Sequence, residues 1–182
     1  FHWINDNSNW LQMDKIGHAT TAYQVGMLGN DLMKWGGVSE KKALWYGGLY
    51  GALFLTTIET LDGFSKEWGA SWGDLIANTT GTFVFIGQEL LWKEQRVQMK
   101  YSFKPSDYAN QRPDILGYNF IQQSLKDYNG QIYWLSFNIN SFKETPLPDW
   151  LNLALGYGAD GMLSGSPFES NTRREYYASL DI

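Results

Sequence analysis

The sequence predicts a mainly α-helical protein, with a bundle of three apolar helices over about residues 14–92 and then an α+β region with a short antiparallel strand pair. Three long apolar stretches in the first half are each bounded by residues that begin or end helices. In the second half, apolar and polar residues alternate along two shorter runs, which is the periodicity of β-strands. We expect residues 1–98 to form a membrane-associated helical module and residues 99–182 an aromatic- and Asn-rich appendage, packed together as one unit.

The first helix is expected from Asp14 to Trp35. Asp14 carries a negative charge, which is favourable at the positive N-terminal end of a helix dipole. Gly36 and Gly37 follow the last apolar residue and are expected to end the helix. A helix of this length would cross most of a bilayer.

The second helix is expected to begin at Ser39, a good N-cap residue, and to end near Asp62 and Gly63. Its uncharged run, Ala43–Ile58, is about sixteen residues long, whereas a membrane crossing usually takes about twenty. A helix that is partly embedded, or covered by protein, therefore fits better than a simple span.

Glycines in the second helix have a spacing that matters for packing. Gly47 and Gly51 are four residues apart, which lets two helices approach closely in lipid. The alternative is that these glycines only make room for a large aromatic neighbour.

The third helix is expected from Ser71 to about Trp92. Ser71 would cap its N-terminus and Asp74 would bond back to it, as in a capping box.

The second half alternates between loops and short elements. We expect a helix over Asp114–Tyr128, a short helix at Pro148–Leu151 that ends at Gly156 and Gly158, and a loop over residues 159–172. Strand alternation covers Tyr133–Asn140 and Tyr176–Ile182, and these two strands are expected to pair.

Composition narrows the possible partners. The 9 Trp, 11 Tyr and 10 Phe favour a membrane interface, where an apolar ring with a polar edge finds suitable solvent, over an aromatic-rich core or a protein interface. With a net charge of -5 and scattered Lys and Arg, nucleic acid is not an expected partner. The chain begins at Phe1 without an initiator Met, so we expect a targeting segment to be missing from this sequence.

Three polar pairs interrupt the apolar helices, each with a spacing that places both side chains on one helix face. The pairs are Asp14 and His18, Glu59 and Asp62, and Asp74 and Asn78. Because such groups are costly on an apolar helix unless they face one another, water or a ligand, we expect the three pairs to face a common centre.

These pairs allow a catalytic interpretation. Asp14 lies one turn before His18 and would fix its tautomer, which leaves the other ring nitrogen free for a proton or metal. Glu59 and Asp62 would then act as acid and base, or as hard ligands. The sequence contains no Cys and only 2 His, so a zinc site of His and Cys is excluded and we expect no metal or other cofactor.

The alternative interpretation is structural. A hydrogen-bonded network that includes Asp74 and Asn78 would lock the three helices together, with Lys15 neutralising one carboxylate.

The chain resembles a known family in three ordered motifs over about residues 10–92. The motifs are Asp14–His18 (DKIGH), Glu59 with Asp62–Ser65 (DGFS), and Ser71–Asn78 (SWGDLIAN) followed by Gly81. They resemble the YfiM-like family of predicted periplasmic lipoproteins and, more distantly, the VanZ-like membrane proteins. The aromatic, Asn-rich second half is similar to longer members from Bacteroidota envelopes. The resemblance implies a location in the bacterial cell envelope, at the outer membrane facing the periplasm, and names no reaction.

Two functions follow as hypotheses. The first is an outer-membrane-associated envelope protein without catalysis, which acts as an accessory or assembly subunit or binds an envelope lipid or glycan; its partners would be membrane lipid and another envelope protein. The second is a membrane-interface hydrolase or transferase that acts on a lipid-linked substrate, with His18 as base, Asp14 orienting it, and Glu59, Asp62 or Asp74 as acid or metal ligand.

Overall fold

The computed structural model describes residues 1–166, 169 and 171–182. The chain divides into two compact units. Residues 1–7 and 15–95 form the first, which we call the helical unit, and residues 8–14 and 96–182 form the second, which we call the sheet unit.

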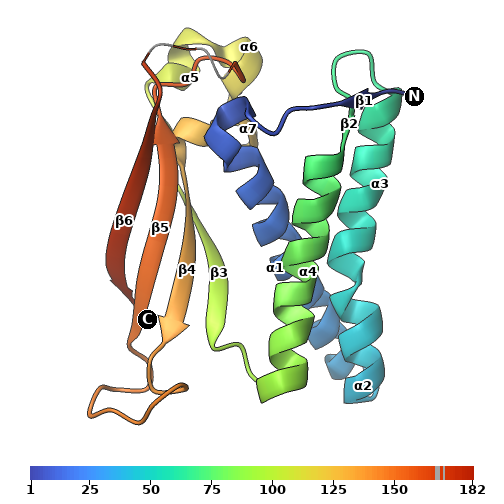
Figure 1. The fold of residues 1–182 in the computed structure, drawn as a ribbon, viewed down its shortest axis with the longest axis vertical. Helices are drawn as coiled ribbons and strands as arrows, with labels where there is room; N and C mark the ends of the chain where they lie inside the picture. The colour runs from blue at the N-terminus through green and yellow to red at the C-terminus, as the bar shows by residue number, and fades with distance from the viewer. Residues whose placement is uncertain (167–168, 170) are drawn as a thin grey trace. The chain divides into compact units, whose positions relative to one another are not determined.

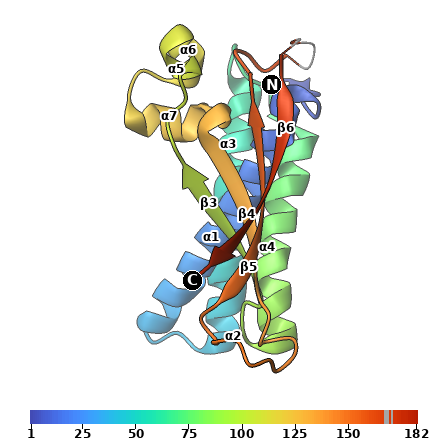
Figure 2. The same cartoon turned by 90° about the vertical axis from the view of Figure 1, so that its left-hand side faces the viewer.

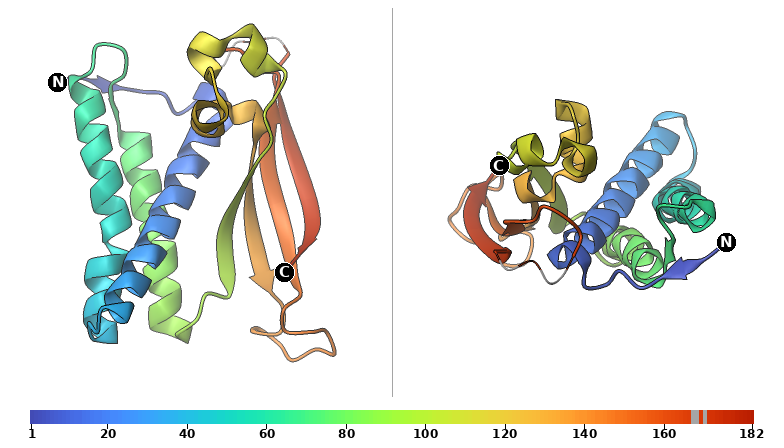
Figure 3. Two further views of the ribbon diagram at one scale, coloured as in Figure 1. Left: turned by 180° about the vertical axis from the view of Figure 1, so that it is seen from behind. Right: turned by 90° about the horizontal axis from the view of Figure 1, so that it is seen from above.

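Three long helices build the helical unit. They are α1 (Met13–Trp35), α3 (Tyr50–Phe64) and α4 (Trp72–Trp92), and they lie side by side (Figure 1, Figure 3). A short helix, α2 (Glu40–Lys42), and a π-helical turn, η2 (Ala43–Gly47), lead into α3. At the N-terminus β1 (Trp3–Ile4) pairs in parallel with β2 (Ala70–Ser71), immediately before α4.

The predicted helix ends are largely confirmed. Gly37 adopts a φ of 82°, and the Val38 amide donates to the Met33 carbonyl at 2.9 Å, which closes the end of α1. Ser71 caps α4, because its Oγ accepts a hydrogen bond from the Asp74 amide at 3.3 Å. Ser39 precedes α2 as expected but makes no side-chain capping bond.

Glycines bring the helix backbones into contact. A Cβ at Gly51 would overlap the carbonyl oxygen of Ala22, and one at Gly81 would overlap the carbonyl oxygen of Ala19, so α3 and α4 both touch α1 through glycine. Gly47 packs in the same way on the backbone of α1. The prediction of close helix approach at Gly47 and Gly51 is therefore confirmed.

Polarity in the helical unit is partly inverted. Polar side chains lie inside beside buried apolar ones such as Tyr23, Phe85 and Ile86, and many large apolar side chains are exposed. Eight polar residues are buried: Thr20, Asn30, Glu59, Ser71, Asp74, Asn78, Thr82 and Gln88. Large apolar residues that are exposed include Trp35, Tyr46, Leu53, Leu61, Phe64, Trp68, Trp72, Ile76, Phe83 and Leu91. Large exposed apolar patches are rare on soluble monomers.

Within the described residues, none of the helices combines the length and the apolar character needed to cross a membrane.

Four antiparallel strands form the sheet unit. They are β3 (Val97–Phe103), β4 (Gln131–Asn138), β5 (Asn152–Asp160) and β6 (Arg173–Asp181), adjacent in chain order. The link from β3 to β4 contains α5 (Tyr108–Gln111), α6 (Pro113–Leu116), α7 (Phe120–Lys126) and a 3₁₀ turn, η3 (Tyr128–Gly130). The segment before α1 adds another 3₁₀ turn, η1 (Asn9–Gln12), and Figure 2 shows the twist of the sheet.

The sheet corrects two predictions. The two expected strands are present, but β5 lies between them, so they do not pair with each other. The short helix expected at Pro148–Leu151 does not form, and Gly156 and Gly158 lie within β5 instead of ending a helix. The reason at Gly156 is tertiary: a Cβ there would collide with the ring of Trp134 on the neighbouring strand.

The helix expected over Asp114–Tyr128 is also corrected. It is broken at Gly117, whose φ of 103° no helix accommodates, and α7 starts afresh at Asn119, whose side chain accepts from the Gln122 amide at 3.0 Å. The loop expected over residues 159–172 includes residues 167, 168 and 170, which lie outside the described residues, and its first two residues belong to β5.

Candidate functional site

Lys15 lies at the centre of a buried polar network in the helical unit. Its Nζ is 2.7 Å from Asp6 Oδ2 and 2.8 Å from Asp74 Oδ1. All three side chains are at least 85 % buried, with exposures of 14 %, 15 % and 5 %. One cation therefore offsets two carboxylates, whereas the structural interpretation expected Lys15 to neutralise one.

Ser71 connects the network to α3, to the start of α4 and to the loop that contains Asp6. Its hydroxyl donates to Asp6 Oδ1 at 2.6 Å and accepts from the Asp74 amide, which caps α4. Its backbone amide donates to Glu59 Oε2 on α3 at 2.8 Å. Asp74 was expected to bond back to this amide, and Glu59 occupies that place instead.

Glu59 is the buried acid of α3, with 4 % of its surface exposed. Burial raises the pKa of its carboxyl to about 7, because the charged form loses hydration. The hydrogen bond from the Ser71 amide lowers the pKa, Asp74 and Asp62 raise it, and His18 lowers it. Glu59 therefore titrates near neutral pH inside the bundle.

His18 lies in the same network but is oriented by Asn78. The ring Nδ1 is 2.9 Å from Asn78 Oδ1, and since an amide oxygen only accepts, Nδ1 carries the proton. The ring Nε2 is 3.8 Å from Asp74, an ion pair when the imidazole is charged. Asp14 was expected to fix the tautomer of His18, and the hydrogen bond that fixes it is made with Asn78.

The structure brings most of the predicted residues together. Lys15, His18, Glu59, Asp74 and Asn78 belong to the network described above. The half-buried Asp62 influences the Glu59 carboxyl electrostatically.

Asp14 begins α1, where one of its carboxylate oxygens lies within 4.8 Å of a ring nitrogen of His18. Its Oδ1 accepts a hydrogen bond from the Tyr128 hydroxyl at 2.7 Å. Two members of the network, Asp6 and Ser71, were not predicted to take part. Asp6 lies outside every predicted helix, and Ser71 already had a complete explanation as a cap, so neither gave a signal in the sequence.

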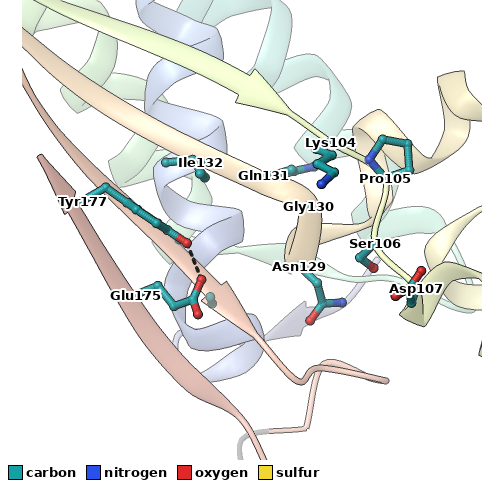
Figure 4. Close-up of a pocket in the computed structure, with 12 residues that line it drawn as sticks. Lys104, Pro105, Ser106, Asp107, Asn129, Gly130, Gln131, Ile132, Glu175 and Tyr177 are labelled. Carbon is teal, nitrogen blue, oxygen red and sulfur yellow. Dashed lines mark hydrogen bonds between the residues drawn. The ribbon is translucent and has the colours of Figure 1, made fainter. Parts of the chain in front are cut away.

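The sheet unit contains a separate hollow of about 350 Å³ beside the end of β3 (Figure 4). Its walls include Lys104, Asn129, Glu175 and Tyr177. Most of these groups already bind protein: Asn129 exchanges hydrogen bonds of 2.8 Å and 2.7 Å with the backbone of Met162, and Glu175 accepts from the Tyr177 hydroxyl. The walls of the hollow are mainly polar, and several of their polar groups are bonded to other residues of the sheet unit.

The helical unit defines a class of protein, a small helical module with a charge-paired polar interior and an apolar exterior. Residues 2–86, which hold the network, match the family model described as predicted periplasmic lipoprotein (DUF2279). The resemblance to predicted periplasmic lipoproteins is thereby confirmed over these residues, and it makes the protein envelope-associated. Neither the curated proteins nor the solved structures gave a match to the chain.

Proposed function

We propose that this protein is a non-catalytic accessory protein of the outer membrane that faces the periplasm. In this proposal the outer surface of the helical unit lies against lipid and the protein serves as a subunit of an envelope assembly. The buried polar network then fixes how the three helices pack, and it contacts no substrate.

The observation that carries the proposal is the partly inverted polarity of the helical unit. Leu53 and Leu61 on α3 are 63 % and 65 % exposed, and Ile76 on α4 is 65 % exposed, whereas Asp74 and Asn78 on α4 are buried. Water would penalise so large an apolar surface, but lipid does not, since acyl chains are as apolar as leucine.

The pairing of Lys15 and Ser71 within the network supports a structural role. Lys15 contacts two carboxylates, and both the hydroxyl and the amide of Ser71 are hydrogen-bonded. Breaking such a buried pair costs about 3–5 kcal/mol because it leaves an uncompensated charge, so these residues stabilise one helix arrangement over others.

Native mass spectrometry of the protein, extracted in mild detergent from its own envelope, tests the proposal. We expect lipid or a protein partner to stay bound both to the wild type and to a His18→Ala, Glu59→Gln double variant. A Leu53→Gln, Leu61→Gln variant should lose them. A Lys41→Gln, Lys42→Gln variant is the matched control, because it introduces two glutamines at exposed positions that are already polar.

Two results would overturn the proposal. One is a monomer that carries neither lipid nor protein, and the other is a small ligand or metal that the wild type retains and only the His18→Ala, Glu59→Gln variant loses.

The second result would favour the other candidate, a membrane-interface hydrolase or transferase. The observation on its side is that Glu59, with its pKa near 7, acts together with His18 in one buried network. In that case a lipid-linked substrate added to the wild type would be consumed, and the rate would fall by about 10²-fold or more in Glu59→Gln.

A further inference from the structure

The two faces of the four-stranded sheet differ in polarity. Residues that pair across the four strands form rows, and each row contains one residue from each strand. On one face, which we call the apolar face, three successive rows carry no charge: Val97, Phe137, Leu153 and Leu180; Met99, Leu135, Leu155 and Ala178; and Tyr101, Tyr133, Tyr157 and Tyr176. A charge enters only in the next row, at Arg174.

The third row is a line of four tyrosines that crosses the whole sheet. Tyr101 pairs with Tyr133, Tyr133 with Tyr157, and Tyr157 with Tyr176. The rings of the first and last pairs are 5.5 Å and 5.6 Å apart. Along the strands the face therefore changes from apolar side chains to tyrosines and then to a mixed level that holds one charge, Arg174.

Much of the apolar face is open to solvent. Leu155 on a central strand is 51 % exposed, and Leu180 and Tyr176 on β6 are 71 % and 75 % exposed.

The opposite face mixes polar residues with apolar ones such as Ile132 and Ala154, and its polar groups bond to one another. Lys100 Nζ lies 2.6 Å from Asp181 Oδ2, which also accepts from the Ser136 hydroxyl. Trp134 Nε1 donates to Ser102 Oγ at 2.9 Å. The contrast between the faces is what a sheet at the boundary of two solvents requires.

We propose that the apolar face of the sheet lies on a lipid bilayer, with the first two rows among the acyl chains and the exposed Tyr101 and Tyr176 of the third row at the headgroups. This inference rests on the proposed membrane association and adds a second lipid contact, separate from the helical unit. The sheet lies on the interface without crossing the bilayer, because an open sheet edge leaves backbone groups unpaired in hydrocarbon.

The order of the rows favours lipid over a protein partner. A protein interface has an apolar core with a polar rim around it, whereas here polarity changes in one direction, along the strands. Apolar side chains, tyrosines and the first charge follow one another as acyl chains, headgroups and water do across a leaflet, and tyrosine concentrates at the headgroup level.

Site-directed labelling along β6 tests the proposal, and the absence of Cys from the sequence makes single-cysteine variants clean. Each residue from Tyr176 to Leu180 is exposed, so each tolerates a label. The full chain, with one NBD fluorophore, is reconstituted with phosphatidylethanolamine and phosphatidylglycerol vesicles whose acyl chains carry a quenching nitroxide.

We expect quenching with a period of two residues. Labels at Tyr176→Cys, Ala178→Cys and Leu180→Cys should be quenched roughly twofold or more above those at Tyr177→Cys and Ser179→Cys, since successive side chains point to opposite faces. A label at Leu61→Cys on α3 reports contact of the helical unit with lipid, and one at Lys42→Cys reports the aqueous baseline.

The controls separate failure of this inference from failure of the proposed function. If Leu61→Cys is quenched and the β6 labels show no alternation, the sheet does not lie on lipid, although the membrane association stands. If neither site is quenched above Lys42→Cys, both proposals are wrong. If Leu180→Cys is already shielded before vesicles are added, protein covers this face and the inference is overturned.

Discussion

At the residue scale, the Glu59 carboxyl illustrates how burial and a single hydrogen bond compete. The Ser71 amide stabilises the ionised form, but loss of hydration outweighs it and the pKa rises from 4.5 to about 7. Lys15 is committed to Asp6 and Asp74, so its charge is shared between two other carboxylates.

Stability should therefore fall as pH rises from about 5 to about 8. In this window the folded state holds a proton on Glu59 that the unfolded chain has released, so deprotonation costs folding free energy. The loss is about 1–3 kcal/mol. Unfolding of the protein in mild detergent at pH 5 and pH 8 measures it.

Glu59→Gln should remove this part of the pH dependence, because the amide oxygen still accepts from Ser71 and carries no charge. Glu67→Gln, at an exposed position, should keep the wild-type profile. If the stability of the wild type and of Glu59→Gln changes with pH in parallel, burial does not raise the pKa of the Glu59 carboxyl.

At the element scale, the contact of α4 with α1 depends on a missing side chain. Gly81 lies against the carbonyl oxygen of Ala19, with no room for a methyl group, whereas a methyl group at Gly87 on the same helix would have no neighbouring atom within 4 Å. Alanine substitutions at these two glycines therefore distinguish the effect of helix packing on stability from the effect of helix propensity.

Gly81→Ala should destabilise the protein by about 1–3 kcal/mol, because the helices must move apart. Gly87→Ala should stabilise it by roughly 0.5–1 kcal/mol, since alanine is the better helix former. Thermal unfolding of both variants measures the effects. Equal effects of the two substitutions would mean that α1 and α4 do not depend on close backbone contact.

At the scale of the whole molecule, the net charge and the exposed apolar surface have opposite effects on membrane binding. The chain carries 14 basic and 19 acidic residues, so an anionic bilayer does not attract it electrostatically. Exposed apolar side chains of both units remain as the source of affinity, and burying them contributes roughly 25 cal/mol per Å².

Vesicle binding should accordingly depend little on salt. Between about 0.05 and 0.5 M salt, where screening changes strongly, we expect affinity to vary by less than about twofold. Flotation with vesicles of phosphatidylcholine alone, and with added phosphatidylglycerol, checks this. Binding that needs the anionic lipid and weakens by about tenfold in salt would assign the affinity to charge.

Local signals predicted much of the helical unit. Asp14, Gly36 and Gly37 mark the ends of α1, and Ser71 marks the start of α4, because capping involves residues within one helical turn. Polar residues in apolar helices, such as Glu59 and Asn78, also predicted that some of these groups meet in the interior.

The sequence by itself determined the three long helices of the first half, which positions in them are polar, and the family resemblance over that half. Only the tertiary structure decided that Lys15 pairs with Asp6, that Asn78 orients His18, and that β5 separates β4 from β6. The physical reason is chain distance: Asp6 and Ser71 are 65 residues apart, and strand order depends on which edges meet. Helix ends are settled within a turn, whereas the network and the sheet form only when distant segments pack together.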